Sequence, residues 1–242
     1  MTDMNSNDSA VNAIKVGFYS GIFLVMITSV TFGLALSAIP IAGANCPGGC
    51  IEYPYLDTTS QYPKDFLWMY PAMLLVISYL ILVISIHVHA PRNKKIFSHI
   101  GLVFSIIASV VLLTDYYMQF SIVPVSLNSG ENQGLPLLIQ YNPHGVFIAL
   151  EELGYLMMSL SFLFIAPVFD NKTRLETSIK WTLIIGFILG FLSLVVISSL
   201  YGLEKLDRFE VFIISINWLV LIICGTLVSF LFRRHLQEIH SI

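Results

Sequence analysis

The chain contains six apolar segments, each long enough to cross a lipid bilayer as a helix. A helical span needs about 20 predominantly apolar residues. The predicted spans are 16–42, 66–90, 97–122, 143–168, 178–202 and 209–232. They are continuous apolar runs without the alternation of barrel strands, so helices are expected to pair the backbone within lipid. The sequence therefore predicts an all-α integral membrane protein, with residues 1–242 forming one six-transmembrane-helix bundle.

Composition excludes the soluble class of protein. Hydrophobic residues make up 56% of the chain and charged residues 11%, whereas a soluble domain typically carries about 25% charged residues. The net charge of −3, without a glycine-rich phosphate loop or a long basic tract, gives no reason to expect a nucleic-acid partner. The expected partners are membrane lipid and a small-molecule or lipid ligand, and the oligomeric state stays open.

Lysine and arginine predict the orientation of the bundle. Nine of them fall at the ends of spans on one side: Lys15, Arg92, Lys94, Lys95, Lys172, Arg174, Lys180, Arg233 and Arg234. Three fall on the opposite side: Lys64, Lys205 and Arg208. The positive-inside rule therefore predicts cytoplasmic N- and C-termini, and we expect a multi-pass protein of the cell (plasma) membrane. The first dozen residues are polar and are expected to form a short mobile tail.

Two adjacent acids lie in the fourth predicted span. The stretch YNPHGVFIALEELGY (141–155) is expected to start a helix near Pro143, with Asn142 as its cap. Glu151 would then lie about 12 Å along the helix. A charge near mid-membrane costs about 2.5–3.5 kcal/mol, and two neighbouring carboxylates disfavour each other's ionisation. Glu151 and Glu152 are therefore the first candidates for a site.

Helical geometry assigns different surroundings to the two acids. Glu151 shares a face with His144 and Tyr155, so we expect His144 to pair with Glu151 through water. Glu152 lies about 100° round the helix and needs a partner from another helix. Further polar candidates at a similar depth are Asp115, Tyr116, Tyr117, Gln119, Asn217 and Trp218. The outer half of the bundle is thus polar, which predicts a cavity open to the outside and covered by the apolar segment 135–139.

Three functional hypotheses follow from this polar cluster. The first is a ligand-binding protein, a transporter or sensor, whose protonatable Glu151 or Glu152 lies with His144, Asp115, Tyr117, Tyr155 and Asn217 in an outer-facing pocket. The second is a membrane enzyme acting on a lipid or apolar substrate with acid and base groups, although no catalytic residue can be assigned. The third is a structural subunit in which the acids only join helices.

The remaining motifs are structural candidates. Cys46 and Cys50 flank Pro and two glycines in an outer connection and are expected to form a disulfide, with free thiols as the alternative. The histidines at 87, 89 and 99 lack the spacing of a metal motif, so no metal site and no cofactor are expected. Gly186 and Gly190 form a G-x-x-x-G pair, which is expected to serve helix packing within the bundle.

Overall fold

The computed structural model describes residues 2–37 and 41–240, and this part of the chain is helical with no strand. The α-helices are α1 (Thr2–Ser37), α2 (Met69–His89), α3 (Lys95–Ser121), α4 (Val123–Ser129), α5 (Val146–Ile165), α6 (Arg174–Tyr201) and α7 (Arg208–His240). Short 3₁₀ helices lie in the connections: η1 (Leu56–Gln61), η2 (Lys64–Phe66), η3 (Arg92–Lys94), η4 (Leu135–Leu137), η5 (Ala166–Val168) and η6 (Gly202–Glu204).

Six helical stretches are long and apolar enough to cross a membrane, which confirms the predicted number. They are Val11–Ser37, Lys64–His89, Arg92–Ser129, Val146–Val168, Arg174–Glu204 and Arg208–Ile239. Several boundaries differ from the prediction, among them the end of the third span, which extends to Ser129. The first dozen residues, expected to form a short mobile tail, belong to α1 from Thr2 onward. The fourth span begins at Val146 and not at Pro143, because Gly145 takes the N-cap position. Residues 38–40, inside the predicted first span, lie outside the described part of the chain.

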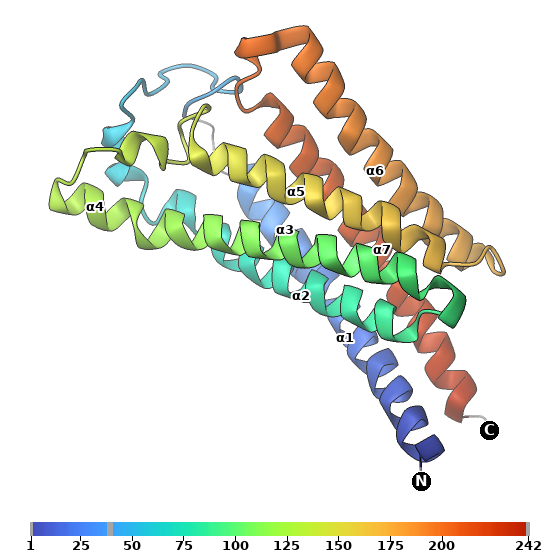
Figure 1. Cartoon of the computed structure of the whole chain (residues 1–242). Coiled ribbons are helices and arrows are strands. Elements are labelled where there is room, and N and C mark those ends of the chain that lie inside the picture. The colour runs from blue at the N-terminus through green and yellow to red at the C-terminus, as the bar shows by residue number, and fades with distance from the viewer. Residues whose placement is uncertain (1, 38–40, 241–242) are drawn as a thin grey trace.

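The two ends of the bundle carry different connections. The N-terminal end of α1 and the C-terminal end of α7 lie at the same end (Figure 1), together with the turns between α2 and α3 and between α5 and α6. The longer connections, 41–68 and 122–145, lie at the opposite end with the turn from α6 to α7. We call this second end the loop end. It holds the predicted outer connections, and its assignment to the outside of a cell stays a prediction.

Glycines allow the helices of the bundle to approach closely. Helix α3 packs along α5, α1 packs on α2 and α7, and α6 packs on α7. A Cβ added at Gly154 of α5 would lie 2.5 Å from Cγ of Leu112 on α3, and one at Gly186 of α6 would lie 2.5 Å from Cγ2 of Val220 on α7. The G-x-x-x-G pair of α6 therefore packs within the bundle, as small residues do between membrane helices.

The outward faces of the helices are apolar. On α6 the exposed side chains include Trp181, Ile185, Ile188, Phe191 and Leu192. A soluble monomer rarely exposes such a continuous apolar face, and contact with lipid explains it. The described structure thus supports a multi-pass integral membrane protein.

Candidate functional site

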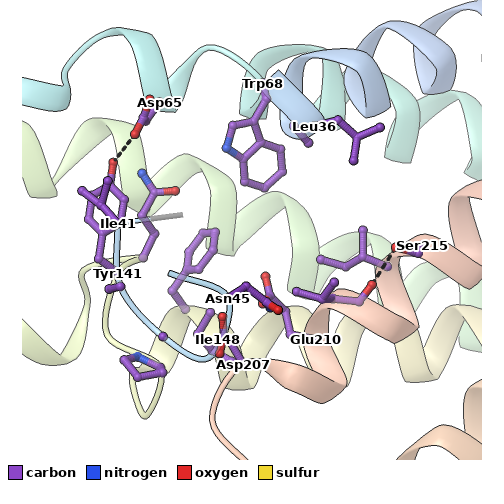
Figure 2. A pocket seen from close by; sticks show the side chains of 18 of the residues that line it. Leu36, Ile41, Asn45, Asp65, Trp68, Tyr141, Ile148, Asp207, Glu210 and Ser215 are labelled. Atoms are coloured by element: carbon purple, nitrogen blue, oxygen red, sulfur yellow. Dashed lines mark hydrogen bonds between the residues drawn. The ribbon is translucent and has the colours of Figure 1, made fainter. Parts of the chain in front are cut away.

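A pocket of about 390 Å³ lies at the loop end of the bundle (Figure 2), within the range of small-molecule sites. Helices α1, α5 and α7 form its walls together with the connections around residues 41–45 and 140–143. Its apolar lining includes Phe32, Ala35, Leu36, Phe147, Ile148, Val211 and Ile214. The pocket lies at the end where the sequence predicted a cavity, but none of the seven predicted site residues lines it, and of the further polar candidates only Trp218 does.

Carboxyl groups give the pocket its charge. Asp65 lies on one side, and Asp207 and Glu210 lie close together on another, near Asn45 (Figure 2). None of the described residues that line the pocket is a lysine, arginine or histidine. The site is therefore a negatively charged hollow with largely apolar walls.

Asp65 is held by a tyrosine from another connection. Tyr141 donates a hydrogen bond from its hydroxyl to Oδ2 of Asp65 at 3.0 Å (Figure 2). Burial raises the pKa of Tyr141 above its ordinary value, and the adjacent Asp65 carboxylate raises it further. Tyr141 is thus a stable donor at neutral pH, and the pair joins the connection before α2 to the one before α5.

Asp207 fixes the rim of the pocket. Its Oδ1 accepts a hydrogen bond from the backbone N–H of Ala44 at 2.7 Å. Gly43 beside it has φ +76°, and a Cβ there would lie 2.5 Å from Oδ2 of Asp207. Glycine is therefore required at this position both for the left-handed backbone and for the close approach.

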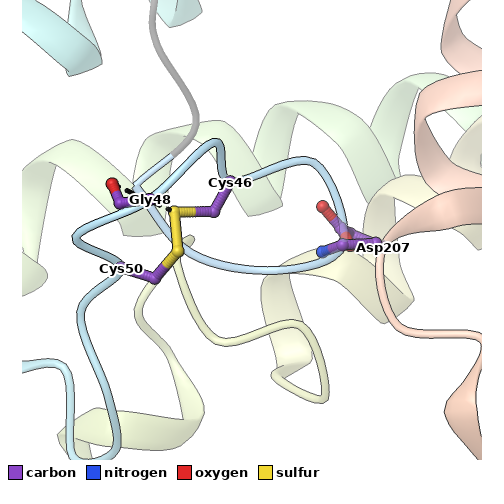
Figure 3. The surroundings of a disulfide bond; sticks show 5 residues. Cys46, Gly48, Cys50 and Asp207 are labelled. Atoms are coloured by element: carbon purple, nitrogen blue, oxygen red, sulfur yellow. Dashed lines mark hydrogen bonds between the residues drawn. A yellow bond between two sulfur atoms is a disulfide. The ribbon is translucent and has the colours of Figure 1, made fainter.

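The same connection contains the predicted disulfide. Cys46 and Cys50 are bonded, with an S–S distance of 2.00 Å (Figure 3), so the prediction is confirmed. The bonded loop directly follows the Gly43–Ala44 contact with Asp207 (Figure 3). The disulfide thereby restricts the segment that closes one side of the pocket.

Besides Tyr141, four aromatic rings line the pocket. Phe32 and Trp218 lie edge to face with their centroids 5.5 Å apart, and Trp68 lies 6.4 Å from Trp218. Phe147 belongs to the same lining. Aromatic faces next to carboxylates form the environment in which proteins hold organic cations.

Behind the pocket, a hydrogen-bond network joins three helices. Tyr116 of α3 donates to Oε1 of Glu151 on α5 at 2.7 Å, and its oxygen lies 2.8 Å from the hydroxyl of Tyr155. Trp218 of α7 donates from Nε1 to the same Tyr155 hydroxyl at 2.9 Å. All four side chains are at most 1% exposed, so this network is closed to solvent.

Glu151 meets a second carboxyl group, which the sequence did not identify as a partner. Glu210 of α7 lies within hydrogen-bonding reach of Glu151, and Asp115 of α3 interacts with both through its charge. Oε2 of Glu151 and Oδ2 of Asp115 are buried and have no hydrogen-bond donor in the described structure. Because Glu210 also lines the pocket, it links the pocket to the buried acids.

Glu152 has a different role from Glu151. Both its carboxylate oxygens accept hydrogen bonds from Nζ of Lys205, at 2.6 and 2.5 Å. Lys205 belongs to the connection between α6 and α7, so the partner comes from a connection and not, as predicted, from another helix. The ion pair explains why a second glutamate is tolerated at this depth, and Glu152 does not line the pocket.

Three other predicted site residues lie outside the pocket. His144 is exposed and precedes α5, so the predicted pairing with Glu151 along one helical face is wrong. Its backbone N–H donates to Oδ1 of Asn142 at 3.0 Å, so Asn142 closes a turn and does not cap the helix. Tyr117 is 58% exposed on α3. Asn217 is buried and donates to Ser159 at 3.0 Å, which joins α7 to α5.

The residues missed from the sequence follow a pattern. Asp65, Tyr141 and Asp207 lie in the connections of the loop end and Glu210 in the first turn of α7, where charged and aromatic residues are expected at the membrane–water interface. The available signal was the spacing of Asp207 and Glu210, which places two acids one turn apart on the pocket side of α7.

The histidines at the other end of the bundle form contacts with each other. The rings of His87 and His99 lie 5.7 Å apart and those of His89 and His235 lie 4.9 Å apart. Nδ1 of His87 lies 2.8 Å from Oγ of Ser98. Among the described residues, no group of three His, Cys, Asp or Glu side chains is arranged to hold a metal ion.

Comparison of the chain with protein-family models, with characterised proteins and with solved structures gave no match, so the functional interpretation depends on this geometry.

Proposed function

We propose that this protein is a membrane-embedded binding protein whose loop-end pocket takes a small amphiphilic ligand. The ligand's apolar body would pack against Phe32, Leu36 and Phe147, and its polar end would donate hydrogen bonds to Asp207 and Glu210. The observation that carries the proposal is the lining itself: an apolar pocket of about 390 Å³ with carboxyl groups and no basic side chain. Apolar walls with a few polar groups are the usual composition of small-molecule sites.

The interior of the bundle favours binding or sensing over transport. In the half nearer the termini, Tyr79, Phe162, Leu221 and their neighbours surround a void of about 30 Å³, which has room for about one or two water molecules. A transported ligand would need a larger path here. With nine basic residues at the terminal end, the positive-inside rule supports a pocket that faces the outside of the cell membrane.

A structural role for the buried network is the second candidate. Tyr116, Tyr155 and Trp218 hydrogen-bond across α3, α5 and α7, which is how polar groups join helices in membranes. This candidate expects no ligand in the pocket. The carboxyl groups of the pocket are also acid and base candidates for the enzyme hypothesis, but no observed geometry assigns a reaction to them.

Tryptophan fluorescence gives a direct test of the pocket. The chain has three tryptophans; Trp68 and Trp218 line the pocket, and Trp181 is exposed on α6. In the Trp181→Phe protein, reconstituted in nanodiscs of zwitterionic phospholipid, all emission therefore comes from the pocket. We expect octylamine or octanol to change this emission saturably.

Two matched variants locate the response. Ala35→Phe places a ring in the pocket and is expected to abolish saturation. Ala149→Phe adds the same ring to an exposed position of α5 outside the lining and is expected to preserve it. A response that never saturates with either compound, or that is the same in both variants, would refute the proposal.

A further inference from the structure

The boundary between the pocket and the buried network is a pair of carboxyl groups. Glu210 is partly exposed to the pocket, and it lies within hydrogen-bonding reach of the fully buried Glu151. Ionised carboxyl groups only accept hydrogen bonds, so two of them can share one only if a proton lies between them. We refer to Glu151 and Glu210 as the carboxyl pair.

The charged and titratable groups around the carboxyl pair are almost all acidic. Helix α3 contributes Asp115 and Tyr116, α5 contributes Glu152 and Tyr155, and Asp207 precedes α7. The basic groups at this end are engaged elsewhere. Lys205 is bonded to Glu152, and the Arg208 guanidinium lies over the Tyr201 ring, 4.4 Å from its centroid. Lys64 is exposed. No base therefore neutralises the carboxyl pair, Asp115 or Asp207 in the described structure.

Two further observations point to a cation. Oδ2 of Asp115 is a buried acceptor without a donor, and a buried acceptor left unpaired is unfavourable. The adjoining pocket has the rings of Phe32, Trp68, Phe147 and Trp218 in its lining, and aromatic faces attract organic cations. An ammonium group supplies three N–H donors and one positive charge, which this region lacks.

We propose that the ligand is an organic cation with a primary ammonium or guanidinium group, and that its binding displaces the proton shared by Glu151 and Glu210. This inference rests on the proposed function of the pocket. The exchange conserves charge: the cation enters, the O–H bond of the protonated carboxyl breaks, its electron pair stays on oxygen, and the proton leaves through the pocket to water. The ammonium then donates to Glu210 while its apolar chain lies among the aromatic rings.

Octylammonium tests the charge requirement, with octanol and octanoate as neutral and anionic probes of similar size. Alkylammonium groups resemble lysine, whose pKa is about 10.4, so octylamine stays charged between pH 5 and about 8. We expect saturable binding of octylammonium to the Trp181→Phe protein in zwitterionic nanodiscs. Octanol is expected to bind at least about 10-fold more weakly, because it lacks the charge-assisted bond.

Proton exchange is measured separately. Titration calorimetry at one pH, in phosphate and in HEPES, gives the number of protons released from the difference in heat between the two buffers. We expect about one proton to be released for each octylammonium bound, at any pH at which the free carboxyl pair still holds its proton. The dissociation constant is then expected to fall by up to about tenfold per pH unit as pH rises.

Isosteric variants assign the exchange to the carboxyl pair. Glu210→Gln is expected to weaken octylammonium binding by about 10- to 100-fold, and Glu151→Gln to abolish proton release. Glu204→Gln, which alters an exposed acid of η6 at the same end, is expected to leave both unchanged. Thermal unfolding of each variant confirms that the fold is retained.

The outcomes separate the two proposals. Saturable binding of octanol or octanoate as tight as that of octylammonium overturns the cation class and leaves the pocket function standing. Octylammonium binding without proton release, or with release unchanged in Glu151→Gln, overturns the exchange. Absence of saturable binding by all three probes overturns the proposed function itself.

Discussion

Tyr116 is the side chain whose hydroxyl does most to join α3 to α5, and Tyr116→Phe removes that hydroxyl alone. The residue is fully buried and makes two interhelical hydrogen bonds, to Glu151 at 2.7 Å and to Tyr155 at 2.8 Å. Interhelical hydrogen bonds in membrane proteins contribute about 0.6 kcal/mol on average and about 1.7 kcal/mol at most. Two such bonds predict that Tyr116→Phe lowers the free energy of unfolding by about 1–3 kcal/mol.

Tyr79 provides a matched control for this substitution. It is 2% exposed on α2, and its hydroxyl lies beside Ser161 without a partner in hydrogen-bonding geometry. The Ser161 hydroxyl instead donates to the carbonyl of Gly101 at 2.7 Å. Tyr79→Phe is therefore expected to be neutral or stabilising, because it removes a buried polar group that is not satisfied.

Reversible unfolding in mixed micelles, with increasing mole fraction of dodecyl sulfate and helix content followed by circular dichroism, measures both variants under the same conditions. We expect the unfolding midpoint of Tyr116→Phe to fall and that of Tyr79→Phe to stay or rise. If the unfolding midpoint of Tyr116→Phe falls no further than that of Tyr79→Phe, the hydrogen-bond network does not stabilise the packing of α3 on α5.

Three further predictions concern packing, the disulfide and pH. Gly186→Leu is expected to cost about 1–3 kcal/mol by overpacking against Val220, whereas Gly33→Leu, with nothing within 4 Å of its Cβ, is expected to leave the unfolding midpoint unchanged. After reduction, an impermeant maleimide is expected to label Cys46 and Cys50 from the side opposite the termini, while buried Cys224 stays unlabelled; labelling before reduction would contradict the disulfide. Hydrogen bonds from Lys94 and Lys172 lower the pKa of Asp170 below its ordinary value of 3.8. The ionised Asp170 therefore stabilises the folded protein above pH 3.8, and this contribution is lost as the pH falls through the lowered pKa. In Asp170→Asn the unfolding midpoint is therefore expected to fall less between neutral pH and pH 3 than in the wild type. An equal fall in the two proteins would contradict this prediction.

The helices were predictable because lipid imposes a single requirement on every span. A long apolar run can satisfy its backbone only as a helix, so the six spans follow from composition and length. Their ends were less predictable, since a helix end depends on local bonds. Asn142 has the chemistry of a cap, but its Oδ1 accepts from the His144 N–H and helix α5 begins later, at Val146.

The sequence predicted the depth of the buried polar groups in the bundle, but not which residues line the pocket. The sequence identified Glu151, Asp115 and Tyr155 as buried polar groups, and the structure places them close to one another. Glu210 was missed because it lies in the first turn of α7, only two residues after Arg208, where an acid resembles an interfacial charge. Only the crossing of α7 with α5 turns that position toward Glu151, and helix crossing is not visible in a single sequence.

Helices α1 and α7, which are far apart in sequence, share the walls of the pocket. Phe32 and Ala35 come from α1, and Glu210 and Trp218 come from α7. During synthesis on a ribosome, α1 enters the membrane long before α7 has been translated. A nascent chain that stops short of α7 would hold the early helices without the complete pocket, so under the proposed function a ligand can bind only after both helices have been inserted.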